Sequence, residues 1–134
     1  MADPFQFELV APEKLLVSEP VDQVVVPGTE GYFAVLKGHA PQMSTLRPGV
    51  VEVQRGGDTE LIFVRGGFAD VGPEGLTILA EQAMPLSELD AATLAQEVQN
   101  AQEDVNDAPD PVAKAAAEMR LNQLQEVQAA KAAA

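Results

Sequence analysis

Two apolar runs meet at a pair of glycines in the segment Leu61-Ile62-Phe63-Val64-Arg65-Gly66-Gly67-Phe68. The first four residues are apolar without a break, which suits a strand covered on both faces, as between two packed sheets. The glycines stand in neither a GxxxxGKS/T nor a GxGxxG pattern, so they give no support for a nucleotide-binding loop. Glycine inside a β-rich segment indicates a tight bend or bulge, and here we expect a strand to change sheet.

Further short β-rich runs lie on both sides of this segment, and turn residues separate them. Residues 5–9 alternate apolar and polar side chains, the pattern of a half-buried strand. Pro27-Gly28-Thr29-Glu30-Gly31 supplies turn chemistry, because proline fixes φ and glycine permits positive φ. Roughly eight to ten strands at this spacing predict a β-sandwich or a flattened barrel. The runs span residues 5–9, 14–19, 21–26, 32–36, 43–46, 50–54, 61–64, 68–71 and 76–79.

The sequence changes character at Pro85. After this residue there is no glycine, and proline occurs only at Pro109 and Pro111. Loss of turn residues together with helical periodicity marks a change of architecture. We therefore predict a β domain over residues 1–85 and a helical hairpin over residues 86–134, a β fold with an α appendage.

Two helices are predicted in this second part. Ser87-Glu88-Leu89-Asp90 has the spacing of a capping box, in which the serine accepts from an early backbone N–H and the acid reaches back. Asp110 can cap the second helix, with Pro111 at its first position. Narrow, alanine-rich stripes predict an antiparallel hairpin that is held only weakly. The stripes are Leu94, Val98, Ala101 and Val105, and then Ala113, Ala117, Leu121, Leu124 and Gln128.

The chain is strongly acidic, with a formal net charge of −13 over 134 residues. This charge argues against binding nucleic acid and against docking on an anionic membrane surface. Two explanations stay open, solubility through self-repulsion and a basic protein partner. The absence of cysteine excludes disulfides and thiolate chemistry. The N-terminus shows no secretory signal, and no apolar run is long enough for a transmembrane segment.

Residues able to support catalysis are scarce. His39 is the one histidine, and with no cysteine it cannot build a usual zinc site. As a general base it would need an orienting carboxylate and a nucleophile, which the sequence does not indicate. A loop histidine bonded to the backbone and a partner contact are the two other interpretations. We expect no metal, no cofactor and no enzyme activity. The alternative hypothesis is a free-standing hydrolase that uses His39.

The β domain carries short loop motifs in a defined order, including Pro27-Gly28-Thr29-Glu30-Gly31, Gly38-His39-Ala40-Pro41 and Leu46-Arg47-Pro48-Gly49. Together they resemble the epsilon subunit of bacterial F-type ATP synthases in order and spacing. The resemblance covers residues 5 to 95, and the helical remainder is similar by architecture only. The other matching segments are Phe7-Glu8-Leu9-Val10-Ala11-Pro12-Glu13, Gly66-Gly67-Phe68 and Leu76-Thr77-Ile78-Leu79-Ala80.

The resemblance implies a ten-stranded β-sandwich followed by an antiparallel helix pair. In that family the sandwich binds the gamma subunit and the ring of c subunits at the foot of the central stalk, and it turns with them. Glu30, Tyr32 and His39 match the ring-facing loops, and Met43 and Ser44 match positions near the gamma contact. Family members often carry an acid where this chain has Tyr32, so an ionic contact there would become an aromatic one.

The resemblance also implies a regulatory role for the helices, which in relatives can reach the alpha/beta catalytic head and restrain ATP hydrolysis. Some relatives bind ATP through Ile or Leu, Asp, two residues and then Arg-Ala, but here Thr93 stands where the arginine should be. From Ser87 onward the charge is −6, with nine acids and three bases, a poor match for an acidic target. We expect weak inhibition at most; an ATP-binding regulatory module whose helices inhibit hydrolysis is the alternative.

The resemblance therefore predicts a non-catalytic rotor subunit that links gamma to the c ring and couples proton-driven rotation to ATP synthesis. It predicts a peripheral location on the cytoplasmic face of the bacterial inner membrane. Contact with the alpha/beta head would run through the helices.

Overall fold

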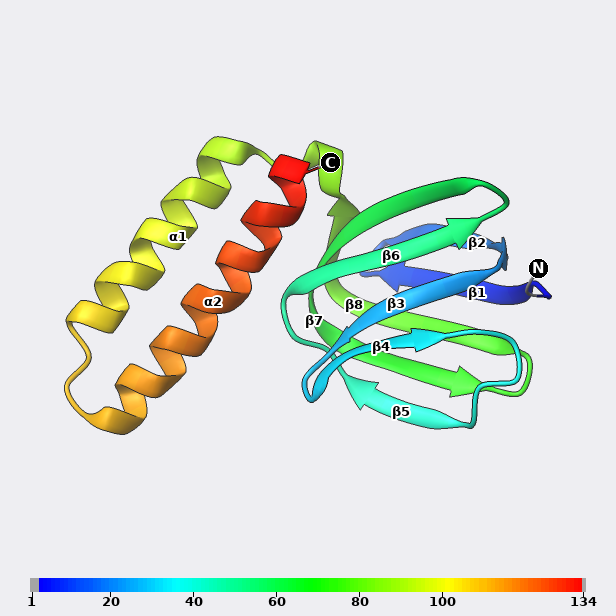
Figure 1. The fold of residues 1–134 in the computed structure, drawn as a ribbon, viewed down its shortest axis with the longest axis horizontal. Coiled ribbons are helices and arrows are strands. Elements are labelled where there is room, and N and C mark those ends of the chain that lie inside the picture. Colours follow the sequence, from blue (N-terminus) through cyan, green and yellow to red (C-terminus); the bar gives the residue numbers. More distant parts are fainter. Residues whose placement is uncertain (1–2, 134) are drawn as a thin grey trace. The chain divides into compact units, whose positions relative to one another are not determined.

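The computed structural model describes residues 3–133, which form two compact units, one up to Leu86 and one from Ser87 onward (Figure 1). The first unit is built from strands alone. A β-sandwich domain with a C-terminal two-helix hairpin is therefore confirmed as the fold class. The strands are β1 (Phe5–Ala11), β2 (Lys14–Val21), β3 (Gln23–Gly28), β4 (Gly31–Val35), β5 (Gln42–Thr45), β6 (Gly49–Arg55), β7 (Asp58–Gly72) and β8 (Gly75–Pro85).

The strands hydrogen-bond in the order β2-β1-β8-β7-β6-β3-β4, and β5 pairs with β7 outside this path. Only the β1–β8 pair is parallel among the pairs that the structure describes. Inward-facing residues of β1 and β8 share one buried cluster with those of β3 and β6, so the sheet folds over on itself to make the sandwich. The fully covered members include Phe7, Leu9, Val24, Val26, Val51, Val53, Ile62, Val64 and Ile78.

The implied number of ten strands is wrong, because β7 and β8 each run unbroken through a bend. The β7–β8 ladder keeps one register from the Ile62–Pro85 pair to the Gly72–Gly75 pair. Within it Gly66 and Gly67 have φ of 69° and 110°, in the region that glycine tolerates. Here β7 exchanges β6 for β5 as its other partner, as expected for the glycine pair. The backbone bends without losing its ladder, so eight strands result.

The apolar run that precedes this bend faces the sandwich core on one side only. Ile62 and Val64 belong to the core cluster, whereas Leu61 and Phe63 occupy the alternate, opposite face. On that face the Arg65 guanidinium carbon lies 5.0 Å from the centre of the Phe63 ring. Phe63 is nevertheless completely buried, so the run is covered on both faces as expected, although only one of these faces belongs to the core cluster.

The second unit consists of a short 3-10 turn, η1 (Leu86–Glu88), followed by α1 (Ala91–Asn106) and α2 (Pro111–Ala133). Asp90 is the N-cap of α1, and its carboxylate accepts from the Thr93 hydroxyl at 2.7 Å and the Thr93 N–H at 3.2 Å. The prediction that Ser87 is the N-cap residue of a capping box is wrong, because Ser87 lies in the 3-10 turn ahead of the helix. Asp110 caps α2 as predicted, accepting from the Ala113 N–H at 2.8 Å.

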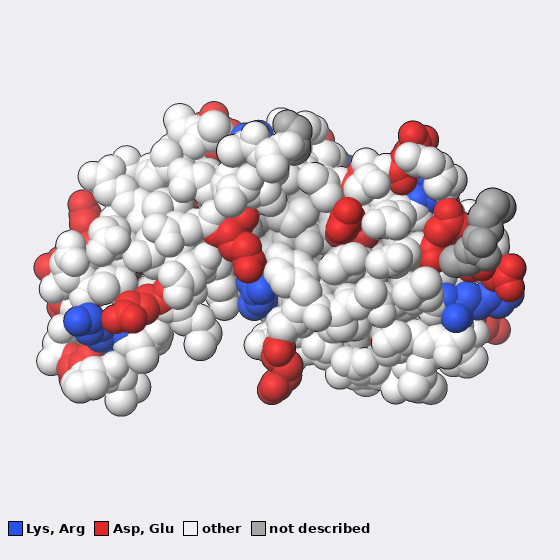
Figure 2. All heavy atoms as spheres, viewed as in Figure 1, with Lys and Arg blue, Asp and Glu red and all other residues white. Residues whose placement is uncertain are grey.

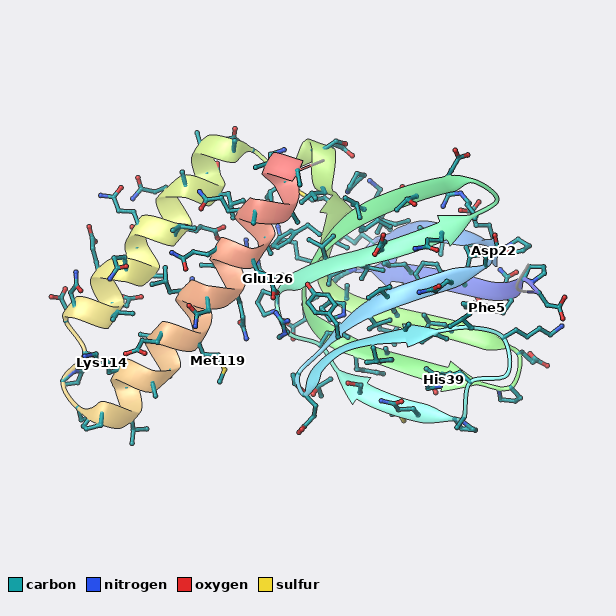
Figure 3. All side chains as sticks on the ribbon, in the orientation of Figure 1. Phe5, Asp22, His39, Lys114, Met119 and Glu126 are labelled. Carbon is teal, nitrogen blue, oxygen red and sulfur yellow. The ribbon has the colours of Figure 1, made fainter. Side chains whose placement is uncertain are left out.

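The helices pack on each other as an antiparallel pair with a small set of buried side chains. Gln128 is exposed and Val127 is buried, so the predicted second stripe is wrong at its last position. Met119 is 63% exposed and points away from α1 (Figure 3). Across residues 3–133 neither helix combines the length and apolarity needed to cross a membrane. The buried helical residues are Leu94, Ala101, Leu121, Leu124 and Val127.

Candidate partner-binding surface

The one histidine is held by its own loop. The Nδ1 atom of His39 lies 2.7 Å from the carbonyl oxygen of Ala40, and its ring centre lies 6.3 Å from that of Phe33. With Lys37 and Glu74 it lines a hollow of about 190 Å³ beside the first residues of β1. Residues 3–133 contain no cluster of three or more His, Cys, Asp or Glu side chains able to hold a metal. These contacts match a loop histidine bonded to backbone.

A more extended feature is a row of apolar side chains on the outer face of the sandwich. Phe68 of β7 lies opposite Leu79 of β8, Leu79 lies opposite Val10 of β1, and Val10 lies opposite Leu15 of β2. The register shift between Leu9 and Val10 turns Leu15 outward. Met43 of β5 shares this face, diagonally next to Phe68, because the register pairs β5 with β7. We call these five residues the apolar row.

The apolar row is open to solvent over most of its length. The exposed fractions are 56% for Leu15, 41% for Leu79, 39% for Phe68 and 68% for Met43, and Val10 is half-buried. In the view of Figure 2, acidic side chains are scattered over the visible face of the β domain, with uncharged areas between them. Single exposed hydrophobic residues are normal, but a connected row across five strands is a feature typical of protein-interaction surfaces.

The two predicted gamma-contact residues lie on opposite faces of β5. Met43 belongs to the apolar row. Ser44 faces the other way, where it is half-buried and its hydroxyl donates to the Thr45 carbonyl at 3.0 Å. A side-chain carbon added at Gly28 would come within 3.0 Å of the Ser44 hydroxyl oxygen, which shows how closely that loop approaches. Of these two adjacent residues, only Met43 therefore lies on the outer face of the sandwich.

The three predicted ring-facing residues do not form one cluster. Glu30 lies in the turn before β4, and His39 lies in the loop after β4, on the side away from that turn (Figure 3). Tyr32 lies on β4, where its hydroxyl accepts from the Val50 N–H at 3.3 Å and its ring lies beneath Arg47. Glu30 and His39 are thus available at the two ends of β4, whereas Tyr32 contacts its own domain and remains 41% exposed.

Four members of the apolar row were not identified from the sequence as binding residues. Phe68 and Leu79 occupy outward positions of their strands, a signal that the period of two could have revealed. Their alignment with Val10 and Leu15 depends on pairing between the distant strands β1 and β8 and on the register shift between β1 and β2. No local pattern contains that information.

Comparison with known proteins agrees with this architecture. A family model described as the ATP synthase delta/epsilon chain β-sandwich domain matches residues 4–86. The ATP synthase epsilon chain of Parvibaculum lavamentivorans is 50% identical over 128 residues, which cover 95% of this chain and 97% of the relative. The epsilon chain of Mesorhizobium japonicum is 51% identical over 125 residues, 92% of this chain and 93% of the relative.

Two solved structures also share the fold. A chain in the Euglena gracilis mitochondrial ATP synthase structure, which comprises OSCP, F1 and the c-ring, superposes with a TM-score of 0.80 and 29% identity. The match covers 97% of this chain and 82% of that one. A chain of the Tetrahymena thermophila mitochondrial ATP synthase central stalk and c-ring gives a TM-score of 0.63 at 15% identity, covering 94% and 95%, and supports the fold alone.

Proposed function

The chain belongs to the ATP synthase delta/epsilon chain family, and on this basis we propose that it is a non-catalytic rotor subunit of the central stalk. In this role it links the gamma subunit to the c-subunit ring, so that proton-driven rotation is coupled to ATP synthesis. The observation that carries the proposal is the match to ATP synthase epsilon chains at about half identity over nearly the whole chain. The related Euglena chain, from a structure that contains F1 and the c-ring, supports the same partners.

The apolar row is the surface proposed to bind gamma. It contains Met43, the predicted gamma-contact residue that points outward, and it extends this position across β7, β8, β1 and β2. Covering exposed Phe68 and Leu79 removes apolar surface from water, which stabilises association by about 25 cal/mol per Å² before the costs of ordering. Ser44 is proposed to act only indirectly, by supporting the loop at Gly28.

The test is binding of the full chain to purified gamma subunit of the same ATP synthase. A Phe68→Asp/Leu79→Asp variant places two charges in the apolar row and should weaken binding at least tenfold. Val112→Asp/Met119→Asp is the matched control, because Val112 and Met119 are 81% and 63% exposed on α2 and take no part in the row. Wild-type affinity in the row variant, with unchanged thermal unfolding, would contradict this surface assignment. Failure of the wild-type chain to bind gamma would contradict the proposed function.

Contact with the c ring is proposed through Glu30 and His39 at the two ends of β4. Both side chains lie in connecting loops, where a partner can reach them. Glu30→Lys and His39→Ala should each reduce ATP-driven proton pumping in reconstituted membranes while leaving gamma binding unchanged. Retention of full pumping in both variants would remove these residues from the ring contact.

We propose that the helical hairpin inhibits ATP hydrolysis weakly at most. Any such inhibition would come from contact between the hairpin and the alpha/beta head. Its charge of −6 is unfavourable for an acidic target, and Asp90 is engaged in capping α1 through Thr93. Deleting residues 88–134 should leave hydrolysis nearly unchanged, and a several-fold rise would contradict weak inhibition. Calorimetry with Mg-ATP tests the alternative, since micromolar binding would favour an ATP-sensing module.

The location proposed for the chain is the cytoplasmic face of the bacterial inner membrane, held there by its partners. The support is the bacterial origin of the epsilon-chain relatives. Fractionation tests this assignment, because the chain should sediment with membranes that carry the c ring and gamma and should be released when gamma is removed.

A further inference from the structure

Three charged side chains occupy inward positions at one end of the sandwich. Glu19 stands between two buried valines of β2, so it faces the same side as they do. Arg55 follows Val53 on the inner side of β6, and Glu60 of β7 lies directly opposite Val53. All three charged side chains are half-buried, at the border of the apolar core. We call Glu19, Arg55 and Glu60 the ionic triad.

The guanidinium of Arg55 connects strand β2 to the β6–β7 hairpin. Its Nη1 atom lies 3.0 Å from Oε1 of Glu19, and its Nη2 atom donates to Oε1 of Glu60 at 2.9 Å. A planar guanidinium can reach two carboxylates at once. The Nη1 atom is enclosed by the protein and has no hydrogen-bond partner within residues 3–133, so its charge depends on the ion pair with Glu19. Among the strands that the structure describes, β2 has a ladder with β1 alone, so the triad is its additional attachment.

The two ends of β2 pair with β1 in different registers. Near the turn Ala11 lies opposite Lys14, but further along Phe7 lies opposite Glu19, so β2 carries one extra residue as a bulge. A hairpin without the bulge would keep the turn-side register and place Glu19 opposite Gln6, which is exposed on the outer face. The guanidinium would then lose its partner on β2.

The chain that leaves β2 is tied to the same hairpin. The Asp22 N–H donates to the Gln54 carbonyl at 2.8 Å, and the Asp22 carboxylate accepts from the Gly56 N–H at 2.8 Å. These bonds hold the end of β2 against β6, so the extra residue of β2 is accommodated nearer to the β1–β2 turn.

We propose that the ionic triad locks the end of β2 in its bulged register. In a register without the bulge, the enclosed nitrogen of Arg55 would lack the carboxylate that compensates its charge, which is costly for a cation partly removed from water. The buried valines of β2 favour the same register, but apolar attraction is not directional, whereas the ion pair requires Glu19 to face inward. This lock operates within one chain, so it does not depend on the proposed partners.

Amide hydrogen exchange of the full chain, followed by nuclear magnetic resonance, tests the lock. Arg55→Met keeps an apolar stem and removes the charge, so the protection of β2 amides should fall by about tenfold or more relative to that of β6. Contacts across the β1–β2 ladder report the register. Glu19 should lie opposite Phe7 in the wild type, and opposite Gln6 in part of the Arg55→Met molecules.

Two double variants decide on which strand Arg55 acts. Arg55→Met/Glu19→Gln removes the charge left facing inward on β2, so β2 protection should return to within about threefold of wild type. Arg55→Met/Glu60→Gln is the matched comparison, because it removes a carboxylate from the hairpin that contains Arg55, and it should leave β2 as weakly protected as Arg55→Met does.

Two results would overturn the lock. One is wild-type protection of β2 in Arg55→Met, and the other is equal rescue by Glu19→Gln and Glu60→Gln, which would confine the action of Arg55 to its own hairpin. If Arg55→Met lowers the stability of the whole β domain, thermal unfolding of the two double variants makes the same distinction, since rescue by Glu19→Gln alone assigns the effect to β2.

Discussion

The guanidinium carbon of Arg47 lies 4.7 Å from the centre of the Tyr32 ring, over its face. The ring therefore carries a cation supplied by the loop that follows β5, and its hydroxyl reaches the Val50 N–H at the start of β6. A side-chain carbon at Gly49 would come within 2.9 Å of this hydroxyl oxygen. Tyr32 thus ties β4 to the entry of β6, a structural task that an acidic residue at this position would not perform in the same way.

Removing the Tyr32 ring should destabilise the β domain. We expect Tyr32→Ala to lower the free energy of unfolding by about 2 kcal/mol, because cation–π contact and apolar packing are both lost. Tyr32→Phe should cost about 0.5–1 kcal/mol, since only the hydroxyl contact disappears. Chemical denaturation measures both. If Tyr32→Ala were as stable as wild type but assembled poorly, Tyr32 would be a partner contact and not a structural one.

Gly67 should not tolerate any side chain. Its φ is 110°, and an added Cβ would overlap the carbonyl oxygen of Leu79 on the paired strand. We expect Gly67→Ala to destabilise the domain by about 3 kcal/mol or more, since backbone strain adds to a clash with main-chain atoms. Gly57→Ala is the control, because nothing lies within 4 Å of its added Cβ and its φ is not positive. Equal melting temperatures for these two variants would contradict the bend at Gly66–Gly67.

The cap of α1 should depend on pH. Hydrogen bonds from the Thr93 hydroxyl and then from its N–H lower the pKa of the Asp90 carboxyl. A lowered pKa in the folded state means that the charged cap stabilises the helix fully above the ordinary carboxyl pKa and loses this effect as pH falls through the folded value. Asp90→Asn should thus melt earlier than wild type at neutral pH, and the difference should vanish in strong acid.

Circular dichroism of the full chain measures this dependence. Asp104→Asn is the control, because Asp104 lies near the C-terminal end of α1, where a negative charge is unfavourable. The control variant should be at least as stable as wild type at neutral pH. A gap between wild type and Asp90→Asn that stayed constant down to strong acid would show that the carboxylate charge contributes nothing to the cap.

Met43 and Ser44 should differ in their effect on partner binding, although they are adjacent. Met43→Lys places a charge in the apolar row and should weaken gamma binding about tenfold or more. Ser44→Ala alters the inner side of β5 and should leave affinity within about twofold, with a loss of stability of about 1 kcal/mol at most. Titration of gamma with each variant separates them, and equal losses of affinity would show that both faces of β5 contact the partner.

Local patterns in the chain were enough to predict the β-sandwich, the helical hairpin and the bend at Gly66–Gly67. Apolar residues recur with a period of two in strands and 3.6 in helices, and these patterns involve only a few neighbouring residues. The same holds for the glycine turns and for the Asp110-Pro111 start of α2. All of these features can therefore be read from the sequence alone. They gave only a range of about eight to ten for the number of strands, since a bent strand counts as one or two depending on whether its hydrogen-bond ladder continues through the bend.

The apolar row was decided by tertiary structure. Val10 and Leu15 come from the β1–β2 hairpin and Phe68 and Leu79 from the β7–β8 hairpin, and the parallel pairing of β1 with β8 joins these two distant hairpins. One register shift between β1 and β2 turns Leu15 outward. A shift of one residue in any of these pairs would send the side chains to the opposite face, so only the folded register could assemble the surface.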